Sequence, residues 1–246
     1  MCQLKSGIIL KDRVFVPEYN SHTDMLEELG IKDTQANAEK LFVRAELLPP
    51  DGDVFKPVDE WKFHVDQDII PDWFIEEVDE ERMVEAVKEW AKDHVHIGVN
   101  NLSIKASGCH YVKDCKNVKA CDSATVKAYG SATVKAYGSA TVEACDSATV
   151  KACDSATVKA YGSATVEAYV SATVEAYGSA TVKAYGSATV EACDSATVEA
   201  YGSATVIIPN YSLNNRDNII ISDNATIKDF KTKTIWQSGN WSVQII

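Results

Sequence analysis

Polar and apolar residues alternate through the second half of the chain with a period that never slips. The tetrapeptide Ser-Ala-Thr-Val occurs eleven times between Ser123 and Val206, once every eight residues. The octad is Ser-Ala-Thr-Val-(Lys/Glu)-Ala-(Tyr/Cys)-(Gly/Asp), and only Val170 departs from its Gly/Asp position. Successive side chains of a strand point to opposite faces, so Ala-Val-Ala lies inside and Ser-Thr-Lys/Glu outside. The pattern predicts a β-solenoid with strands of about six residues and two-residue Tyr-Gly or Cys-Asp corners.

The Lys/Glu position indicates how many octads form one coil. Stacked strands bring equivalent residues about 4.8 Å apart, where like charges repel. With two octads per coil, six of eight stacked pairs between positions 127 and 199 have opposite charges, against one of seven for three octads and five of nine for one octad. We therefore expect a mainly β fold, a two-sheet β-solenoid of five to six coils with sixteen residues per coil.

Composition along the chain predicts three segments. Residues 1–102 lack the octad and are expected to form an α+β domain that caps the solenoid, and residues 103–206 form the octapeptide-repeat β-solenoid. Residues 207–246 hold a degenerate repeat and a C-terminal β cap. Within that segment, Pro and Asn predict a projecting loop over 207–222. Alternating residues predict a strand pair with a Ser-Gly-Asn turn over 234–246.

Decayed octads flank the perfect array. Val118 upstream and the segment Asn224–Phe230 downstream fit the octad pattern imperfectly. Terminal coils of a solenoid are atypical because their outer edges must resist end-to-end stacking. We therefore expect the solenoid to continue beyond the perfect repeats on both sides.

The first hundred residues carry patterns of both helices and strands. Apolar residues between Asp79 and His94 recur at helical spacing, and acidic residues fill the first turn. The other expected elements are a hairpin over Gly7–Val16, a helix over Thr23–Leu29 that ends at Gly30, and strands over Leu41–Leu47 and Glu60–Val65.

The repeats resemble the repeat region of bacterial ice nucleation proteins over about a third of the chain. The matching residues are Tyr129-Gly130-Ser131, Tyr137-Gly138-Ser139, Tyr161-Gly162-Ser163 and their successors. The resemblance implies a two-octad solenoid with a tyrosine ladder along an edge, a candidate for dimerisation, and it makes ice binding an alternative function. That family presents paired threonines on a flat, uncharged face, whereas here Lys or Glu follows each threonine on the same face.

The N-terminal block resembles uncharacterised proteins of gut Firmicutes and their phages. The residues that carry this resemblance are Met1–Ser6, Asp24–Gly30 and Val65–Trp73. It implies no activity or site, and it points only to a phage or other mobile-element setting.

Two surfaces are candidates for binding a protein partner. The first is the tyrosine edge, where a sixteen-residue coil predicts a seam for self-association into a homodimer. The second is an acidic segment at the entrance of the predicted long helix. The tyrosines are Tyr137, Tyr169, Tyr185 and Tyr201 on one edge and Tyr129, Tyr161 and Tyr177 on the other. The acidic residues are Asp66, Asp68, Asp72, Glu76 and Glu77.

Charge is concentrated in the N-terminal hundred residues. They contain eleven basic and twenty-three acidic residues, a net charge of −12 that equals the net charge of the whole chain. Direct binding of nucleic acid is disfavoured because no basic patch is present to release counterions from phosphates. An acidic surface can instead occupy a basic, nucleic-acid-binding protein, which makes a phage-type decoy or inhibitor of a host protein an alternative function.

The sequence predicts neither an active site nor a cofactor. Phosphate-binding loops, nucleophile elbows and zinc-helix motifs are absent, so any hidden activity would lie in residues 1–100. Seven cysteines, an odd number, indicate thiols in a reducing compartment, and Cys109, Cys115 and Cys121 lack a standard zinc spacing. No signal peptide or apolar run of membrane length is found, so no membrane contact is expected and a cytoplasmic location follows, in the organism or in an infected host cell.

These observations favour a non-enzymatic structural or interaction scaffold. A near-uniform array gives every coil the same groups, so it offers a periodic surface and no unique active centre. The acidic decoy and the ice-binding protein remain alternatives.

Overall fold

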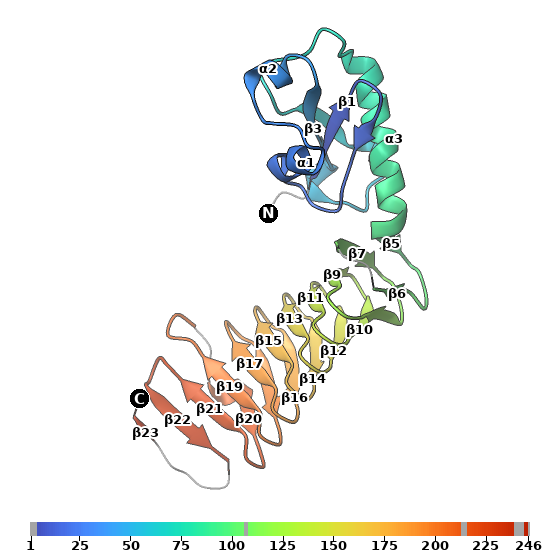
Figure 1. The fold of residues 1–246 in the computed structure, drawn as a ribbon. Coiled ribbons are helices and arrows are strands. Elements are labelled where there is room, and N and C mark those ends of the chain that lie inside the picture. The colour runs from blue at the N-terminus through green and yellow to red at the C-terminus, as the bar shows by residue number, and fades with distance from the viewer. Residues whose placement is uncertain (1–3, 106–107, 213–215, 239–243, 246) are drawn as a thin grey trace. The chain divides into compact units, whose positions relative to one another are not determined.

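The computed structural model describes residues 4–105, 108–212, 216–238 and 244–245 (Figure 1). The chain divides into two compact units, Met1–Val95 and His96–Ile246. The first unit is α+β with a small antiparallel sheet, and the second is a two-sheet parallel β-solenoid, as the sequence predicts.

The N-terminal unit has a four-stranded antiparallel sheet in the order β2-β1-β3-β4. Its strands are β1 (Lys5–Leu10), β2 (Val14–Phe15), β3 (Phe42–Leu48) and β4 (Lys62–Val65). Its helices are α1 (His22–Glu28), α2 (Gln35–Ala38) and α3 (Glu76–His94), with short 3-10 turns at η1 (Pro50–Gly52) and η2 (Val58–Glu60). The expected hairpin, both expected strands and both expected helices are therefore confirmed, with shifts of a few residues at their ends.

The two faces of this sheet bury different helices. Ile8 of β1 packs with Met25 of α1 and Phe42 of β3 in one apolar cluster. Gly7, the neighbouring residue, points to the opposite face because side chains alternate along a strand. A Cβ at Gly7 would lie 2.9 Å from Sδ and Cε of Met83 and 3.1 Å from the Phe15 carbonyl oxygen, so α3 packs closely against β1 at this glycine.

In the described part of the chain, the solenoid consists of an eight-stranded and an eleven-stranded sheet, and consecutive strands alternate between the two until the last three strands, which all belong to the larger sheet. The smaller sheet contains β6 (Ser103–Ile104), β8 (Val118–Ala120), β10 (Thr133–Ala136), β12 (Thr149–Ala152), β14 (Thr165–Ala168), β16 (Thr181–Ala184), β18 (Thr197–Ala200) and β20 (Ile219–Ile221). The larger sheet contains β5 (Val95–Ile97), β7 (Cys109–Lys113), β9 (Thr125–Tyr129), β11 (Thr141–Ala144), β13 (Thr157–Ala160), β15 (Thr173–Ala176), β17 (Thr189–Ala192), β19 (Thr205–Ile208), β21 (Thr226–Asp229), β22 (Thr234–Gln237) and β23 (Gln244–Ile245).

Equivalent residues of neighbouring coils stack directly on one another. Val158 of β13 pairs in parallel with Val142 of β11 and Val174 of β15, a register of sixteen residues in both directions. The valines and both alanines of each perfect octad are buried and form one continuous core between the sheets. The predicted inward Ala-Val-Ala face and the sixteen-residue coil are confirmed.

The strands are shorter and the corners longer than the sequence predicts. Each strand of the perfect array between β10 and β18 has four residues, Thr-Val-(Lys/Glu)-Ala, instead of about six. In the corner Tyr137–Ala140, the Ala140 N–H donates to the Tyr137 carbonyl at 3.3 Å. Gly138 in that corner has a φ of 65°. The turn thus ends the regular strand on both sides of the Gly/Asp position, although hydrogen bonds between coils continue through the corner, as from the Ser139 N–H to the Asp122 carbonyl at 2.8 Å. The flanking alanine stays buried.

The solenoid has about seven turns, more than the five to six expected, because strands that depart from the octad also join the sheets. Ile219 of β20 pairs with Val198, so the expected loop over 207–222 contains strand residues at both ends. Between these strands, the Tyr211 hydroxyl donates to the Glu191 carboxylate. At the C-terminal end β22 pairs antiparallel with β21 and β23, which confirms the strand pair, while its turn lies outside the described residues.

Val170 is a strained corner residue and provides a test of the turn. Its φ is 61°, in the left-handed region that a β-branched residue avoids, and its side chain is exposed. Replacing Val170 with glycine is therefore expected to raise the free energy of unfolding by about 1 kcal/mol. Urea denaturation measures the change, and Val170→Ala, which keeps Cβ, should gain less. A lower stability for Val170→Gly would contradict the strain.

Candidate functional site

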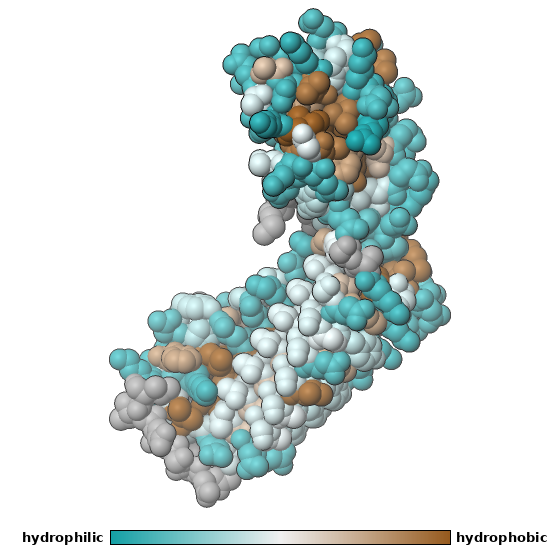
Figure 2. All heavy atoms as spheres, viewed as in Figure 1, coloured by the Kyte–Doolittle hydropathy of each residue, from teal (hydrophilic) through white to brown (hydrophobic). Residues whose placement is uncertain are grey.

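The outer surface of the solenoid carries two columns of stacked Lys and Glu residues, one on each sheet. Figure 2 shows pale residues of intermediate hydropathy along one side of the solenoid, with hydrophilic residues beside them. Among the described residues, four ion pairs join neighbouring coils, and in each the lysine is on the coil nearer the N-terminus. They are Lys127–Glu143 at 3.1 Å, Lys151–Glu167 at 2.7 Å, Lys159–Glu175 at 3.0 Å and Lys183–Glu199 at 3.0 Å. The opposite-charge stacking inferred from the sequence therefore produces real contacts.

Three of these glutamates also accept a hydrogen bond from the tyrosine two residues later. The hydroxyl of Tyr169 donates to Glu167 at 2.8 Å. The same bond recurs in Tyr177–Glu175 at 2.9 Å and Tyr201–Glu199 at 2.8 Å. The solenoid thus repeats a Lys–Glu–Tyr triad, whose lysine is supplied by the preceding coil.

The triads shift the pKa values of their members in a consistent direction. The hydrogen bonds from Lys151 and Tyr169 lower the pKa of Glu167. Burial alone would raise the pKa of Glu175, but the hydrogen bonds from Lys159 and Tyr177 outweigh it and lower that pKa. In return, the hydrogen bond to Glu167 raises the pKa of Lys151. The lysine and the glutamate of each triad are therefore both charged at neutral pH.

Acid is expected to remove the stabilisation that the triads provide. A carboxylate whose folded pKa lies below its ordinary value of 4.5 stabilises the fold above that pH and loses this effect as pH falls through the folded pKa. Urea denaturation from pH 7 to pH 3 should show a stability gap between the natural chain and a Glu167/Glu175/Glu199→Gln variant that closes below about pH 4.5. A gap that stays constant across this range would show that the ionised carboxylates contribute nothing.

The predicted tyrosine edges exist, but cysteines interrupt them. Tyr185 stacks between Tyr169 and Tyr201, with ring centroids 5.0 and 5.2 Å apart. On the other edge Tyr161 stacks on Tyr177 at 5.2 Å. Cys153 takes the corner position between Tyr137 and Tyr169, and Cys145 takes the one between Tyr129 and Tyr161, so Tyr137 and Tyr129 are separated from these stacks.

The corner aspartates link coils in a way that the sequence analysis missed. Asp146 accepts a hydrogen bond from the Gly130 N–H at 3.0 Å, one coil earlier. The same hydrogen bond joins the Gly138 N–H to Asp154 at 3.1 Å and the Gly178 N–H to Asp194 at 3.0 Å. The signal for this contact is an aspartate placed sixteen residues after a glycine, at equivalent corner positions of neighbouring coils.

The acidic residues of the N-terminal unit are exposed, but they do not share one environment. Asp66 and Asp68 follow β4, Asp72 precedes α3, and Glu76 and Glu77 open α3. Asp66 faces His22, with 3.2 Å between its Oδ2 and the histidine Nδ1. The surface is therefore a run of separate carboxylates, one of which has a histidine partner.

The fold and its outer surface define a β-solenoid with tandem sixteen-residue coils. Comparison of the chain with protein-family models, curated proteins and solved structures found no match. The resemblances to ice nucleation repeats and to phage proteins therefore stay predictions. Among the described residues, no helix has the length and apolar character needed to span a membrane.

Proposed function

We propose that this protein is a non-enzymatic scaffold whose solenoid presents a periodic surface for self-association or for binding another protein. The observation that carries the proposal is the recurrence of the Lys–Glu–Tyr triad at equivalent positions on successive coils. Repeated, identical groups suit a partner that is itself periodic, and the most direct periodic partner is a second copy of this chain.

The stack of Tyr169, Tyr185 and Tyr201 is the best candidate for the contact. These rings are half-buried and held parallel, and the hydroxyls of Tyr169 and Tyr201 are fixed by glutamates of the same coils. Aromatic side chains that are ordered before binding lose little conformational entropy on docking. An ordered tyrosine ladder therefore favours association of two solenoids along this edge.

A second candidate, the acidic decoy, is supported by the exposed carboxylates of Asp68, Asp72, Glu76 and Glu77. The salt dependence of binding distinguishes the two proposed functions. Affinity that depends on charge falls steeply as ionic strength rises, whereas affinity that depends on aromatic contacts does not. Ice binding has less support, because the Lys and Glu columns lie on the same outer face as the threonines.

Sedimentation velocity over a range of concentrations tests self-association. We expect the natural chain to form a dimer that a Tyr169/Tyr185/Tyr201→Ser variant does not form. A Tyr161/Tyr177→Ser variant is the matched control, since it alters the shorter stack on the other edge and should still dimerise. A monomer in all three proteins at every concentration would exclude self-association through the tyrosines.

A further inference from the structure

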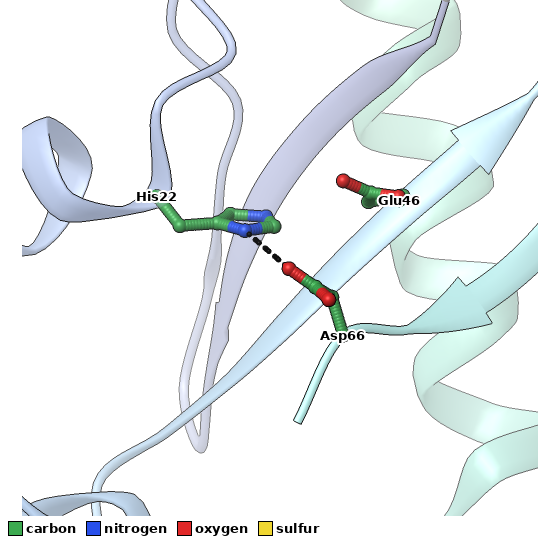
Figure 3. A group of neighbouring side chains, drawn as sticks. All are labelled: His22, Glu46 and Asp66. Carbon is green, nitrogen blue, oxygen red and sulfur yellow. Dashed lines mark hydrogen bonds and ion pairs between the residues drawn. The ribbon is translucent and has the colours of Figure 1, made fainter. Parts of the chain in front are cut away.

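Three potential metal ligands meet on one face of the N-terminal sheet. His22 opens α1, Glu46 lies in β3 and Asp66 directly follows β4 (Figure 3). One ligand atom of each residue lies within 4.8 Å of the others. We infer that His22, Glu46 and Asp66 bind a divalent transition-metal ion of the Zn²⁺ type.

The hydrogen bonds of His22 leave one ring nitrogen facing a carboxylate. Nε2 lies 3.3 Å from the Ala45 carbonyl, which can only accept, so Nε2 carries the proton. In the neutral ring, Nδ1 then presents its lone pair to Asp66 Oδ2 at 3.2 Å. Two lone pairs repel at that distance unless either a proton on Nδ1 or a metal ion lies between them. A ligating histidine commonly donates its second N–H to a backbone carbonyl in this way.

The separation between the ligand atoms of His22 and Asp66 is close to that expected around a tetrahedral ion. Two ligand atoms at the usual Zn–N and Zn–O distances are separated by about 3.4 Å in a tetrahedral site. The separation of 3.2 Å between His22 Nδ1 and Asp66 Oδ2 is close to that value. Glu46 would complete three protein ligands, and because Asp66 is exposed, water can take the fourth position.

Ser6 provides a second, independent observation at the same place. It is the partner of Glu46 across the antiparallel β1–β3 pair, so both side chains leave the same face of the sheet. The side chain of Ser6 is completely buried, and among the described residues its Oγ has no hydrogen-bond partner. A hydroxyl in this position can orient the Glu46 carboxylate once a metal ion fixes it.

Charge at the site also favours a cation. Within the described part of the chain, neither Glu46 nor Asp66 forms an ion pair with a lysine or an arginine. The N-terminal hundred residues have a net charge of −12. An imidazole among the ligands favours zinc or a related transition metal over Mg²⁺ and Ca²⁺, which prefer oxygen ligands only.

Zinc competition against a chromophoric chelator tests the site. The full chain is first stripped with EDTA, and its accessible thiols are alkylated in the folded state, because the cysteines can also bind zinc. We expect one equivalent of Zn²⁺ to bind and to raise Tm. The variants His22→Asn, Glu46→Gln and Asp66→Asn should each weaken binding by at least about tenfold. Asp68→Asn, with the same charge change two residues beyond Asp66, should bind as the natural chain does.

Two outcomes would overturn the inference. If the alkylated natural chain binds no Zn²⁺, His22 and Asp66 form only an ion pair with a doubly protonated ring. If Zn²⁺ binds equally well to the three variants, the ion occupies another place. Far-UV circular dichroism of each variant confirms that it is folded before its affinity is compared.

Discussion

Replacing Val158 with aspartate is expected to disrupt folding of the solenoid. Val158 is completely buried between Val142 and Val174 in the middle of the core. A carboxylate at this position would be charged and surrounded by alanine and valine side chains, with no partner to compensate its desolvation. We expect the free energy of unfolding to fall by at least about 4 kcal/mol, which is much of the stability of an ordinary domain. Urea denaturation followed by circular dichroism would measure the loss.

Thr157→Asp is the matched control for this prediction. Thr157 is the preceding residue of the same strand, and its side chain points outward. The same carboxylate would remain solvated there, so its cost should stay within about 1 kcal/mol. If both variants lowered the free energy of unfolding equally, Val158 would not be on the buried face of the strand with Thr157 on the solvent face.

Deleting one complete coil is expected to leave a folded protein with one turn fewer. Removing residues 174–189 joins Thr173 to Val190, which restores an octad and stacks Glu191 on Lys159. Each coil of a solenoid contacts mainly its neighbours, so the remaining coils keep their environment. The shortened chain should unfold cooperatively, with a smaller denaturant m-value because less surface becomes exposed.

Removing a single additional residue should have the opposite result. Deletion of residues 174–190 also takes Val190 and joins Thr173 to Glu191. The alternation then shifts by one position, which directs Glu191 into the core and Ala192 to the solvent. We expect loss of cooperative unfolding and a strong tendency to aggregate. Similar stabilities of the two deletions would mean that the strand register does not depend on the alternation.

The sequence predicted the solenoid well because its constraints are local and repeated. Val126 and its equivalents must lie inside if Lys127 and its equivalents lie outside, and eleven copies exclude other registers. Strand length was predicted less well. In each corner the alanine N–H donates to the Tyr or Cys carbonyl, and this hydrogen bond depends on turn geometry, which the alternation of polarity does not report.

The direction of the contacts between coils required the structure. The charge series predicted that Lys159 stacks between Glu143 and Glu175, but not that it pairs with the latter. The tyrosine hydroxyl that completes each triad was also not predicted, because Tyr169 and its equivalents were assigned to the corners, where strand alternation does not define the direction of a side chain.

The sequence by itself determined the solenoid, its sixteen-residue coil and its inner and outer faces, because a short exact period fixes each residue's environment through its nearest neighbours. Only the tertiary structure brought together His22, Glu46 and Asp66. These residues belong to an aperiodic segment, and their meeting depends on the antiparallel register of β1, β3 and β4 and on the packing of α1. Such long-range pairing has no repeated signal along the chain, so no local pattern could have predicted it.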